Sequence, residues 1–243
     1  MTKSLYLRCE PEEIGERVLL TGDPARVERI AESFSDARTI ATNREFHVMT
    51  GSYAGKTYSA VSSGIGAPSA AIAIEELAQL GAKAIVRVGT TMGIDLPMGC
   101  LVLSSGSARF EATSNAYWGL EFPAIPDWQL ARTLQDSACA LGQKVYVGMT
   151  ATYDAFYPKM APALVNRGLP DMQILRRAGV IALDMETSLV HVLGHALGIA
   201  TASICLITNN ADPFQIIDNE QRVHGESMLI KTVLDALAKW TAS

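Results

Sequence analysis

The sequence predicts an α/β fold in which helices cover both faces of a central mixed β-sheet, giving a three-layer sandwich. Short apolar runs alternate along the chain with longer segments whose apolar residues recur at helical spacing. Glycine-containing turns follow several apolar runs and open directly into helical segments, as in strand–turn–helix units. The chain has 243 residues, of which 49% are hydrophobic, and no repeat or break in composition divides it. We therefore expect a single domain over residues 1–243.

The expected strands are apolar runs bounded by turn residues. They lie at residues 18–20, 57–61, 84–88, 101–103, 144–147 and 202–207. Helical periodicity begins near residue 25 and also covers residues 68–80, 129–141 and 186–197. A C-terminal helix is expected to bury one apolar face, made of Val223, Ile230, Val233, Leu234, Leu237 and Trp240. Residues 104–126 and 156–170 show neither pattern, and long loops of a compact domain often carry function.

Composition and charge exclude several classes of function. The net charge is −5 and the calculated isoelectric point is about 5.4, whereas a general nucleic-acid-binding protein carries a basic face. The N-terminus lacks an apolar signal region, and no run approaches the roughly 18 apolar residues of a membrane span. Scattered cysteines without metal-type spacing predict reduced thiols: Cys9, Cys100, Cys139 and Cys205. We expect a cytoplasmic protein that binds small molecules, and neither nucleic acid nor membrane.

The first informative turn, residues 21–26, follows a strand and opens a helix. Gly22 lets the backbone approach a ligand closely, and the helix N-terminus favours an anion. Arg26 can add a fork of charged donors to that anion. The alternative is an ordinary strand–turn–helix junction with a solvated arginine. Taken alone, the turn favours this alternative, because such junctions are common.

The second turn follows an apolar strand that contains Arg87. An arginine there must find an anionic partner or reach solvent, because an unpaired buried charge is very costly. Gly89 and the hydroxyl of Thr90 follow at the end of the strand, and the three groups together suit a phosphate. The alternative is a structural ion pair between Arg87 and a carboxylate of the core.

Two further junctions are weaker signals. Residues 62–69 are rich in serine and glycine, but they lack the full spacing of a dinucleotide fingerprint, and no Walker lysine follows them. Residues 183–188 place two carboxylates around Met185 at a strand-to-helix junction. Glu186 is suited to hold sugar hydroxyls and Met185 to pack on a sugar face. Acids at a helix start also favour the helix dipole without any ligand, and this simpler explanation is preferred when the junction stands alone.

Eight segments, taken in order, resemble the nucleoside phosphorylase family and specifically its uridine phosphorylase-like branch. They are residues 22–27, 43–46, 64–69, 74–77, 87–91, 120–123, 154–158 and 184–186. The resemblance covers nearly the whole chain and implies the α/β/α sandwich of that family. Each segment is weak alone, but eight in one order are hard to obtain by chance.

The resemblance implies a ligand site in three parts. Phosphate would contact Gly22, Arg26, Arg44, Arg87, Gly89 and Thr90. Ribose would contact Tyr6, Thr90, Met185 and Glu186. The base would contact Phe156, Met160, Asp184 and Asn209. Asp184 stands where the family usually has a glutamate, as the first acid of the ribose motif.

The resemblance also implies that subunits share their sites. Arg44 would reach the phosphate site of a neighbouring subunit, and Tyr6 is the nearest match to a histidine that the neighbour supplies in this family. Members of this branch usually form hexamers built as trimers of dimers. Some bind a monovalent cation such as potassium at the dimer interface, through positions that match Glu45, Ile65 and Ser69. No organic cofactor is implied, since inorganic phosphate is the co-substrate.

The residues that would read the base depart from the family pattern. Uridine phosphorylases use a glutamine and an arginine after the Phe-Tyr-Pro segment, where this chain has Met160 and Pro162. Hexameric purine phosphorylases use an aspartate where this chain has Asn209. The run 206–209 resembles the trimeric purine phosphorylases, which read 6-oxopurines with an asparagine. Asp212 lies nearby and could serve as the acid if its loop folds back.

Cleavage of an N-glycosidic bond builds positive charge on the sugar and negative charge on the base. A fixed phosphate dianion supplies both the nucleophile and the counter-charge, so catalysis is mainly positioning and electrostatic stabilisation. The residues expected to carry it are Arg87, Glu186, Asn209 and Asp212. We predict a pentosyltransferase of the uridine phosphorylase type, with a purine nucleoside phosphorylase as the alternative. Further alternatives are a hydrolase of the same fold, which would not require cationic anchors, and a non-catalytic nucleoside-binding protein.

Overall fold

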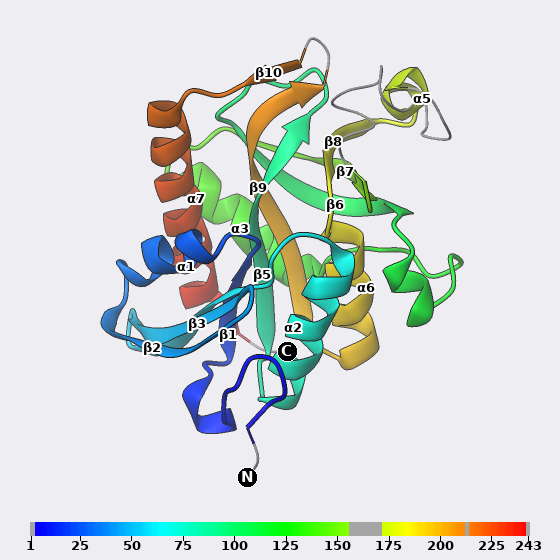
Figure 1. The fold of residues 1–243 in the computed structure, drawn as a ribbon. Coiled ribbons are helices and arrows are strands. Elements are labelled where there is room, and N and C mark those ends of the chain that lie inside the picture. Colours follow the sequence, from blue (N-terminus) through cyan, green and yellow to red (C-terminus); the bar gives the residue numbers. More distant parts are fainter. Residues whose placement is uncertain (1–2, 156–171, 212–213, 242–243) are drawn as a thin grey trace.

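The computed structural model describes residues 3–155, 172–211 and 214–241, and their strands form one ten-stranded sheet (Figure 1). In chain order the strands are β1 (Arg17–Thr21), β2 (Ser35–Asn43), β3 (Phe46–Tyr53), β4 (Lys56–Ser62), β5 (Ala84–Gly93), β6 (Leu101–Phe110), β7 (Val145–Tyr153), β8 (Val180–Asp184), β9 (Ala200–Ala211) and β10 (Phe214–Ile216). The helices are α1 (Pro24–Ala31), α2 (Ala67–Gln79), α3 (Trp128–Ala140), α5 (Met172–Arg177), α6 (Thr187–Leu197) and α7 (Asn219–Lys239). Two short 3-10 helices are η1 (Pro11–Glu13) and η2 (Thr113–Ala116).

The sheet is mixed and partly closed. Its strand order is β10-β9-β6-β7-β8-β5-β1-β4-β3-β2. An additional parallel pairing joins β9 to β5, so that β5, β9, β6, β7 and β8 form a ring of paired strands. β1 lies parallel between β4 and β5, whereas β3 runs antiparallel to β4. The predicted mixed sheet is therefore confirmed.

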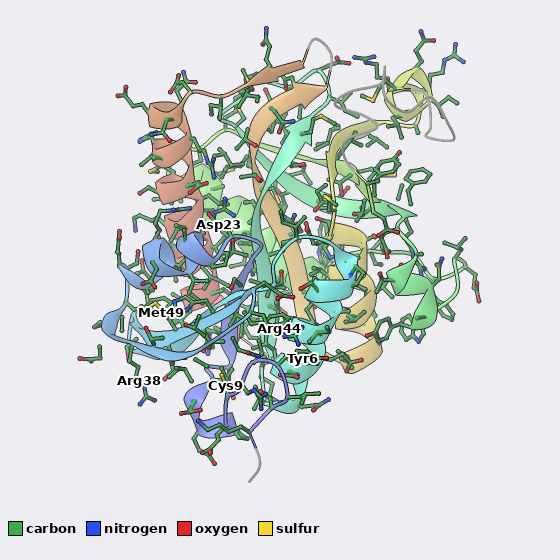
Figure 2. The ribbon with its side chains drawn as sticks, viewed as in Figure 1. Tyr6, Cys9, Asp23, Arg38, Arg44 and Met49 are labelled. Atoms are coloured by element: carbon green, nitrogen blue, oxygen red, sulfur yellow. The ribbon has the colours of Figure 1, made fainter. Side chains whose placement is uncertain are left out.

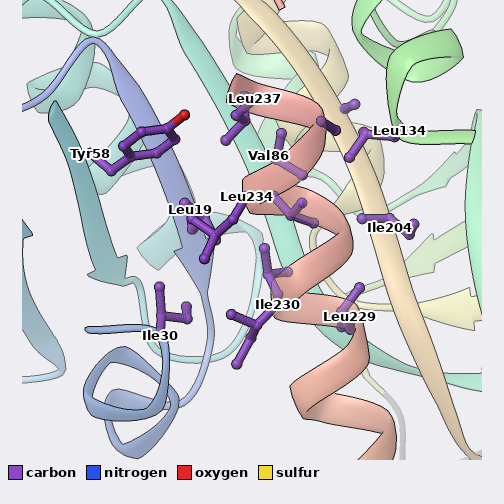
Figure 3. Packing of buried hydrophobic residues seen from close by; sticks show 14 of the residues in the cluster. Leu19, Ile30, Tyr58, Val86, Leu134, Ile204, Leu229, Ile230, Leu234 and Leu237 are labelled. Atoms are coloured by element: carbon purple, nitrogen blue, oxygen red, sulfur yellow. The ribbon is translucent and has the colours of Figure 1, made fainter. Parts of the chain in front are cut away.

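Helices cover both faces of the central strands, which confirms the three-layer sandwich. On one face, residues of α1, α3 and α7 share one core with Leu19 of β1, Val86 of β5 and Ile204 of β9 (Figure 3). On the other face, residues of α2 and α6 pack on Leu20 and Ile85, the neighbours of Leu19 and Val86 along the same strands. Because successive side chains of a strand point to opposite faces, each apolar strand supplies both cores.

The C-terminal helix α7 buries most of the face that its spacing predicts. Leu229, Ile230, Leu234 and Leu237 pack against β1, β5 and β9 (Figure 3). The exception is Val223, which is 54% exposed, so its predicted burial is wrong. The buried residues of α7 begin only at Gly225, because its first turns extend beyond the apolar core. Among the described residues, no helix is long and apolar enough to cross a membrane.

Several regions differ from the sequence-based expectation. Residues 89–93 were expected as a turn after a strand, but β5 continues through them to Gly93. The prediction that residues 104–126 are irregular is wrong for the first of them, because β6 continues to Phe110. These serine- and glycine-rich positions remain a strand because β7 pairs with them in parallel. The edge strand β2 has no buried residue, so it lacks the apolar pattern by which a strand is recognised. Two more strands were likewise not expected. They are β3, which runs antiparallel to β4, and β8, which runs antiparallel to β5.

Candidate active site

A cavity of about 460 Å³ lies where β1, β5, β8 and β9 approach their carboxyl ends. That volume is in the range of small-molecule sites, and the ends of parallel strands are a usual place for them. The lining residues are Gly22, Asp23, Pro24, Arg26, Ile65, Arg87, Gly89, Thr90, Thr91, Met92, Asp184, Met185, Glu186, Asn209 and Arg222. The fold thus brings together three of the four junctions on which the sequence-based site depends, and Ile65 of the fourth.

Arg87 is the most strongly held cation of the cavity. It is 8% exposed, and its Nη2 forms ion pairs with Asp184, at 3.1 Å, and with Glu186. Its Nη1 donates to the sulfur of Cys205 at 2.7 Å. A Cβ at position 89 would collide with that same nitrogen, so Gly89 is required for the guanidinium to lie there. Arg87 therefore both forms an ion pair in the core and lines the cavity, so the two alternatives considered for it hold together.

Arg26 is also buried, at 3% exposed, which makes the expectation of a solvated arginine wrong. Asp23 begins the helix α1 by accepting a hydrogen bond from the backbone of Ala25, and this turn directs Arg26 inward. Arg26 Nη1 donates to Thr21 Oγ1 at 2.9 Å, and Nη2 forms an ion pair with Glu226 at 2.8 Å. The first turn of α1 therefore supplies a second fixed guanidinium to the cavity wall.

Glu186 is fixed by two junctions that are distant in sequence. One carboxylate oxygen accepts a 2.6 Å hydrogen bond from the backbone of Gly66, and the other pairs with Arg87. Gly66 has a φ of 98°, a conformation that favours glycine and turns its N–H toward the carboxylate. The serine- and glycine-rich turn before α2, a weak motif by itself, thus positions Glu186 beside Met185 in the cavity wall.

Asp184 borders the cavity, but its carboxylate is occupied by protein groups. It accepts hydrogen bonds from Thr152 Oγ1, at 2.8 Å, and from the backbone and hydroxyl of Thr187. It is 3% exposed and also pairs with Arg87. These contacts favour a role in holding Arg87, and a contact between Asp184 and the base stays a prediction.

Tyr6 and Arg44 do not line this cavity but lie together elsewhere on the surface (Figure 2). The guanidinium carbon of Arg44 is 5.9 Å from the centre of the Tyr6 ring. Glu76 accepts a 2.8 Å hydrogen bond from the backbone of Tyr6, and Asn43 donates a bond of the same length to its carbonyl. Two side chains that the resemblance assigns to a neighbour's site therefore lie side by side, Arg44 exposed and Tyr6 partly buried.

The three residues expected to bind a monovalent cation lie near one another. Ser69 donates a 3.1 Å hydrogen bond to the carboxylate of Glu45, and Ile65 is 76% exposed at the wall of the cavity. Among the described residues, no cluster of three or more histidine, cysteine or acidic side chains is placed to hold a metal ion.

The part of the cavity where the resemblance would place the base is described only in part. Asn209 lies there, paired in register with Met92 of β5, and both line the cavity. Phe156, Met160 and Asp212 lie outside the described residues, so their expected roles stay predictions. The structure adds Arg222, an exposed residue in the first turns of α7 that sequence reasoning missed. It stands in a polar stretch before the apolar face of that helix, a weak signal without the tertiary fold.

Comparison with known proteins gives the family. A profile of the phosphorylase superfamily matches residues 16–239. The chain is 34% identical over 245 residues to a uridine phosphorylase of Thermococcus kodakarensis, covering 97% of this chain and 87% of that protein. A guanosine phosphorylase of Halorubrum lacusprofundi is also 34% identical, over 86% of this chain and 85% of its own length. The protein belongs to the phosphorylase superfamily.

Solved structures agree with this assignment. The purine nucleoside phosphorylase of Toxoplasma gondii, in complex with immucillin-H, superimposes with a TM-score of 0.89 and 28% identity, covering 98% of this chain and 96% of that one. The uridine phosphorylase of Vibrio fischeri gives a TM-score of 0.88 and 30% identity, covering 99% and 98%. The expected family, fold and enzyme class of pentosyltransferases are thereby confirmed.

Proposed function

We propose that this protein is a nucleoside phosphorylase that converts a ribonucleoside and phosphate reversibly into free base and ribose 1-phosphate. The observation that carries this proposal is the pair of buried arginines, Arg26 and Arg87, in one cavity wall with Glu186. Two fixed guanidiniums suit a dianion, and the adjacent carboxylate suits sugar hydroxyls. Family membership supports phosphate as the co-substrate and requires no organic cofactor.

In the proposed reaction a phosphate oxygen forms a bond to C1′ of ribose, and the C1′–N bond breaks. The bonding electron pair leaves with the base, which must then gain a proton or delocalise the charge. Arg26, Arg87 and Thr90, with the backbone of Gly22 and Gly89, would hold the phosphate. Because these groups are fixed before the reaction, they can stabilise the developing charge with little reorganisation.

The shared site between subunits is part of the proposal. Arg44 has a φ of 57° and an exposed side chain that lies over the ring of the partly buried Tyr6, so both belong to the same surface region. We propose that this pair enters the phosphate and ribose region of a second copy in a dimer, within a hexamer. Potassium would bind at the same interface through Glu45, Ile65 and Ser69. We also place the enzyme in the cytoplasm.

Uridine is the first substrate to test, because several relatives are uridine phosphorylases of 30 to 34% identity. A 6-oxopurine nucleoside such as inosine is the second candidate, and Asn209 in the cavity wall favours it. An asparagine side chain offers both a donor and an acceptor to a purine. Two relatives, a guanosine phosphorylase and a purine nucleoside phosphorylase, are compatible with this alternative.

The deciding experiment is a panel of uridine, inosine and guanosine, each assayed with and without phosphate. Phosphorolysis predicts that base is released only with phosphate and that ribose 1-phosphate accumulates. Equal cleavage in phosphate-free buffer would identify a hydrolase instead. Tight nucleoside binding without turnover under either condition would indicate a non-catalytic binding protein.

A further inference from the structure

A buried carboxylate on α7 contacts three arginines beside the proposed phosphate site. Glu226 is 2% exposed, and its Oε1 accepts from Arg26 Nη2 at 2.8 Å and from Arg222 Nε at 3.1 Å. Its Oε2 accepts from Arg29 Nη2 at 2.9 Å. Arg26 and Arg222 line the cavity, whereas Glu226 and Arg29 lie behind them. The carboxylate is therefore placed to act on the cavity through its two lining arginines.

The surroundings keep Glu226 ionised at neutral pH. Burial raises its pKa, but the hydrogen bonds and charges of Arg26, Arg222 and Arg29 outweigh burial and lower the pKa below its usual value. Arg29 is shared with Asp23, whose carboxylate lies 3.1 Å from the same nitrogen. The cluster thus holds three cations and two anions, so one positive charge is left over for a ligand.

Arg26 retains a donor that Glu226 does not occupy. No described residue accepts a hydrogen bond from its Nε, although this nitrogen is buried. A buried donor without a partner is unfavourable, and a phosphate oxygen would satisfy it. Phosphate and Glu226 can therefore contact the same guanidinium together, and their like charges then repel each other across it.

We propose that Glu226 is the permanent counter-ion of the proposed phosphate site. It is a positioning residue that holds Arg26 and Arg222 at the cavity, and its charge limits the affinity of the site for phosphate. Before phosphate binds, it prevents two lining arginines from being left without an anion. After the reaction, its repulsion favours release of the sugar phosphate product. This inference rests on the proposed phosphate site.

The test is the substitution Glu226→Gln, which keeps an oxygen acceptor for the arginines and removes the charge. The KM for phosphate and the dissociation constant of inorganic phosphate should fall about tenfold, which corresponds to about 1.4 kcal/mol. The KM for the nucleoside should stay within about twofold, and product inhibition by ribose 1-phosphate should strengthen. The matched control is Asp235→Asn, which removes an ion-paired carboxylate from the same helix away from the cavity. It should leave all of these constants unchanged.

A purely structural role for Glu226 predicts that the KM for phosphate does not fall in Glu226→Gln. If Glu226 only supported the fold, Glu226→Gln would loosen Arg26, and the KM for phosphate would rise or stay unchanged. Either result overturns the inference. A wild-type enzyme that cleaves nucleosides without phosphate would instead overturn the proposed function, so the two failures are distinguishable.

A second variant covers the case in which Glu226→Gln does not fold. Arg29 is partly exposed and does not line the cavity, so Arg29→Gln is a milder change. This variant leaves the charge of Glu226 less neutralised. The KM for phosphate should therefore rise about threefold, which corresponds to about 0.6 kcal/mol. No change in this constant would overturn the inference. Where both variants fold, the effect of Arg29→Gln should disappear in the Glu226→Gln background, because it acts through that charge.

Discussion

The proposed phosphate end of the cavity, at Arg26 and Arg87, and the proposed base end, at Asn209, differ in how their polar side chains are held. At the phosphate end, Arg26 and Arg87 are 3% and 8% exposed, and each forms an ion pair with a buried carboxylate. At the base end, Asn209 is half-buried, and the bond to its side-chain oxygen comes from its own neighbour, Thr208, at 3.3 Å. The arginines of the first end are thus held by ion pairs, whereas no described residue other than Thr208 is hydrogen-bonded to the side chain of Asn209.

This difference suggests that the residues proposed to carry out the reaction are distinct from those proposed to select the base. Every ribonucleoside presents a ribose and would meet the same phosphate, so the proposed contacts to both can be built into the central strands and the turns that follow them. The base varies, and it faces a few side chains whose replacement leaves the scaffold intact. Relatives named for uridine and for guanosine therefore lie at the same 34% identity.

The largest expected effect comes from breaking the phosphate end at Arg87. Arg87→Ala would remove a proposed phosphate contact, and it leaves Asp184 and Glu186 buried without their cation. We expect kcat/KM to fall roughly a thousandfold or more, about 4 kcal/mol of transition-state stabilisation. Steady-state kinetics with phosphate varied would measure it. Arg132→Ala, in an exposed ion pair on α3, is the control and should have no effect. A loss in kcat/KM of less than about tenfold would mean that the use of phosphate does not depend on Arg87.

The next effect concerns the part of the phosphate end that a neighbour would supply. Arg44→Ala and Glu186→Ala should each be nearly inactive alone. In mixed dimers one of the two sites has both residues, so mixing equal amounts should restore about a quarter of the wild-type activity. The proteins should be mixed under conditions that allow subunits to exchange. A fully active monomer at assay concentration would contradict the shared site.

A smaller effect is expected at the base end. If Asn209 reads a purine, Asn209→Ala should reduce inosine turnover at least tenfold, about 1.4 kcal/mol. The affinity for phosphate should hardly change, because the other end of the cavity is intact. Competition assays with inosine and uridine would give both specificity constants. Efficient turnover of uridine and none of inosine by the wild type would show that Asn209 does not serve this purpose.

The smallest effect concerns the helix α6 that follows Glu186. His191 is fully buried, and neither ring nitrogen has a partner among the described residues. Burial, together with the charges of His195 and Arg87, lowers its pKa to about 3. Replacing it by leucine should raise the free energy of unfolding at pH 7 by about 1 kcal/mol, because an unpartnered polar group leaves the core.

The gain from His191→Leu should grow as the pH falls. An unfolded histidine takes up a proton below about pH 6.5, whereas the folded one stays neutral until about pH 3. The wild type therefore loses stability through this window, and the variant lacks that loss. Urea unfolding at pH 7 and pH 5 would measure both values. Equal stability differences at the two pH values would show that His191 is not held neutral.

Much of the fold followed from local pattern. Apolar runs such as residues 84–88 and the helical spacing of residues 68–80 identified their elements, because strand and helix periodicity depends on near neighbours. The edge strand β2 was missed, since most of its residues are polar or exposed and pairing with β3 makes it a strand. The end of β6 was missed for the same reason, as β7 supplies its hydrogen bonds.

The candidate site likewise has features that the local sequence predicts and features that only the tertiary structure decides. Gly22 and Arg26 were expected where a strand turns into a helix, and Arg87 within an apolar strand, because these are features of local sequence. What each arginine contacts was decided only by the tertiary structure. Glu226 meets Arg26 across 200 positions of sequence, and Glu186 meets Arg87 across 99. Such pairs depend on the order of strands in the sheet and on which helix packs over them, and no local spacing encodes that order.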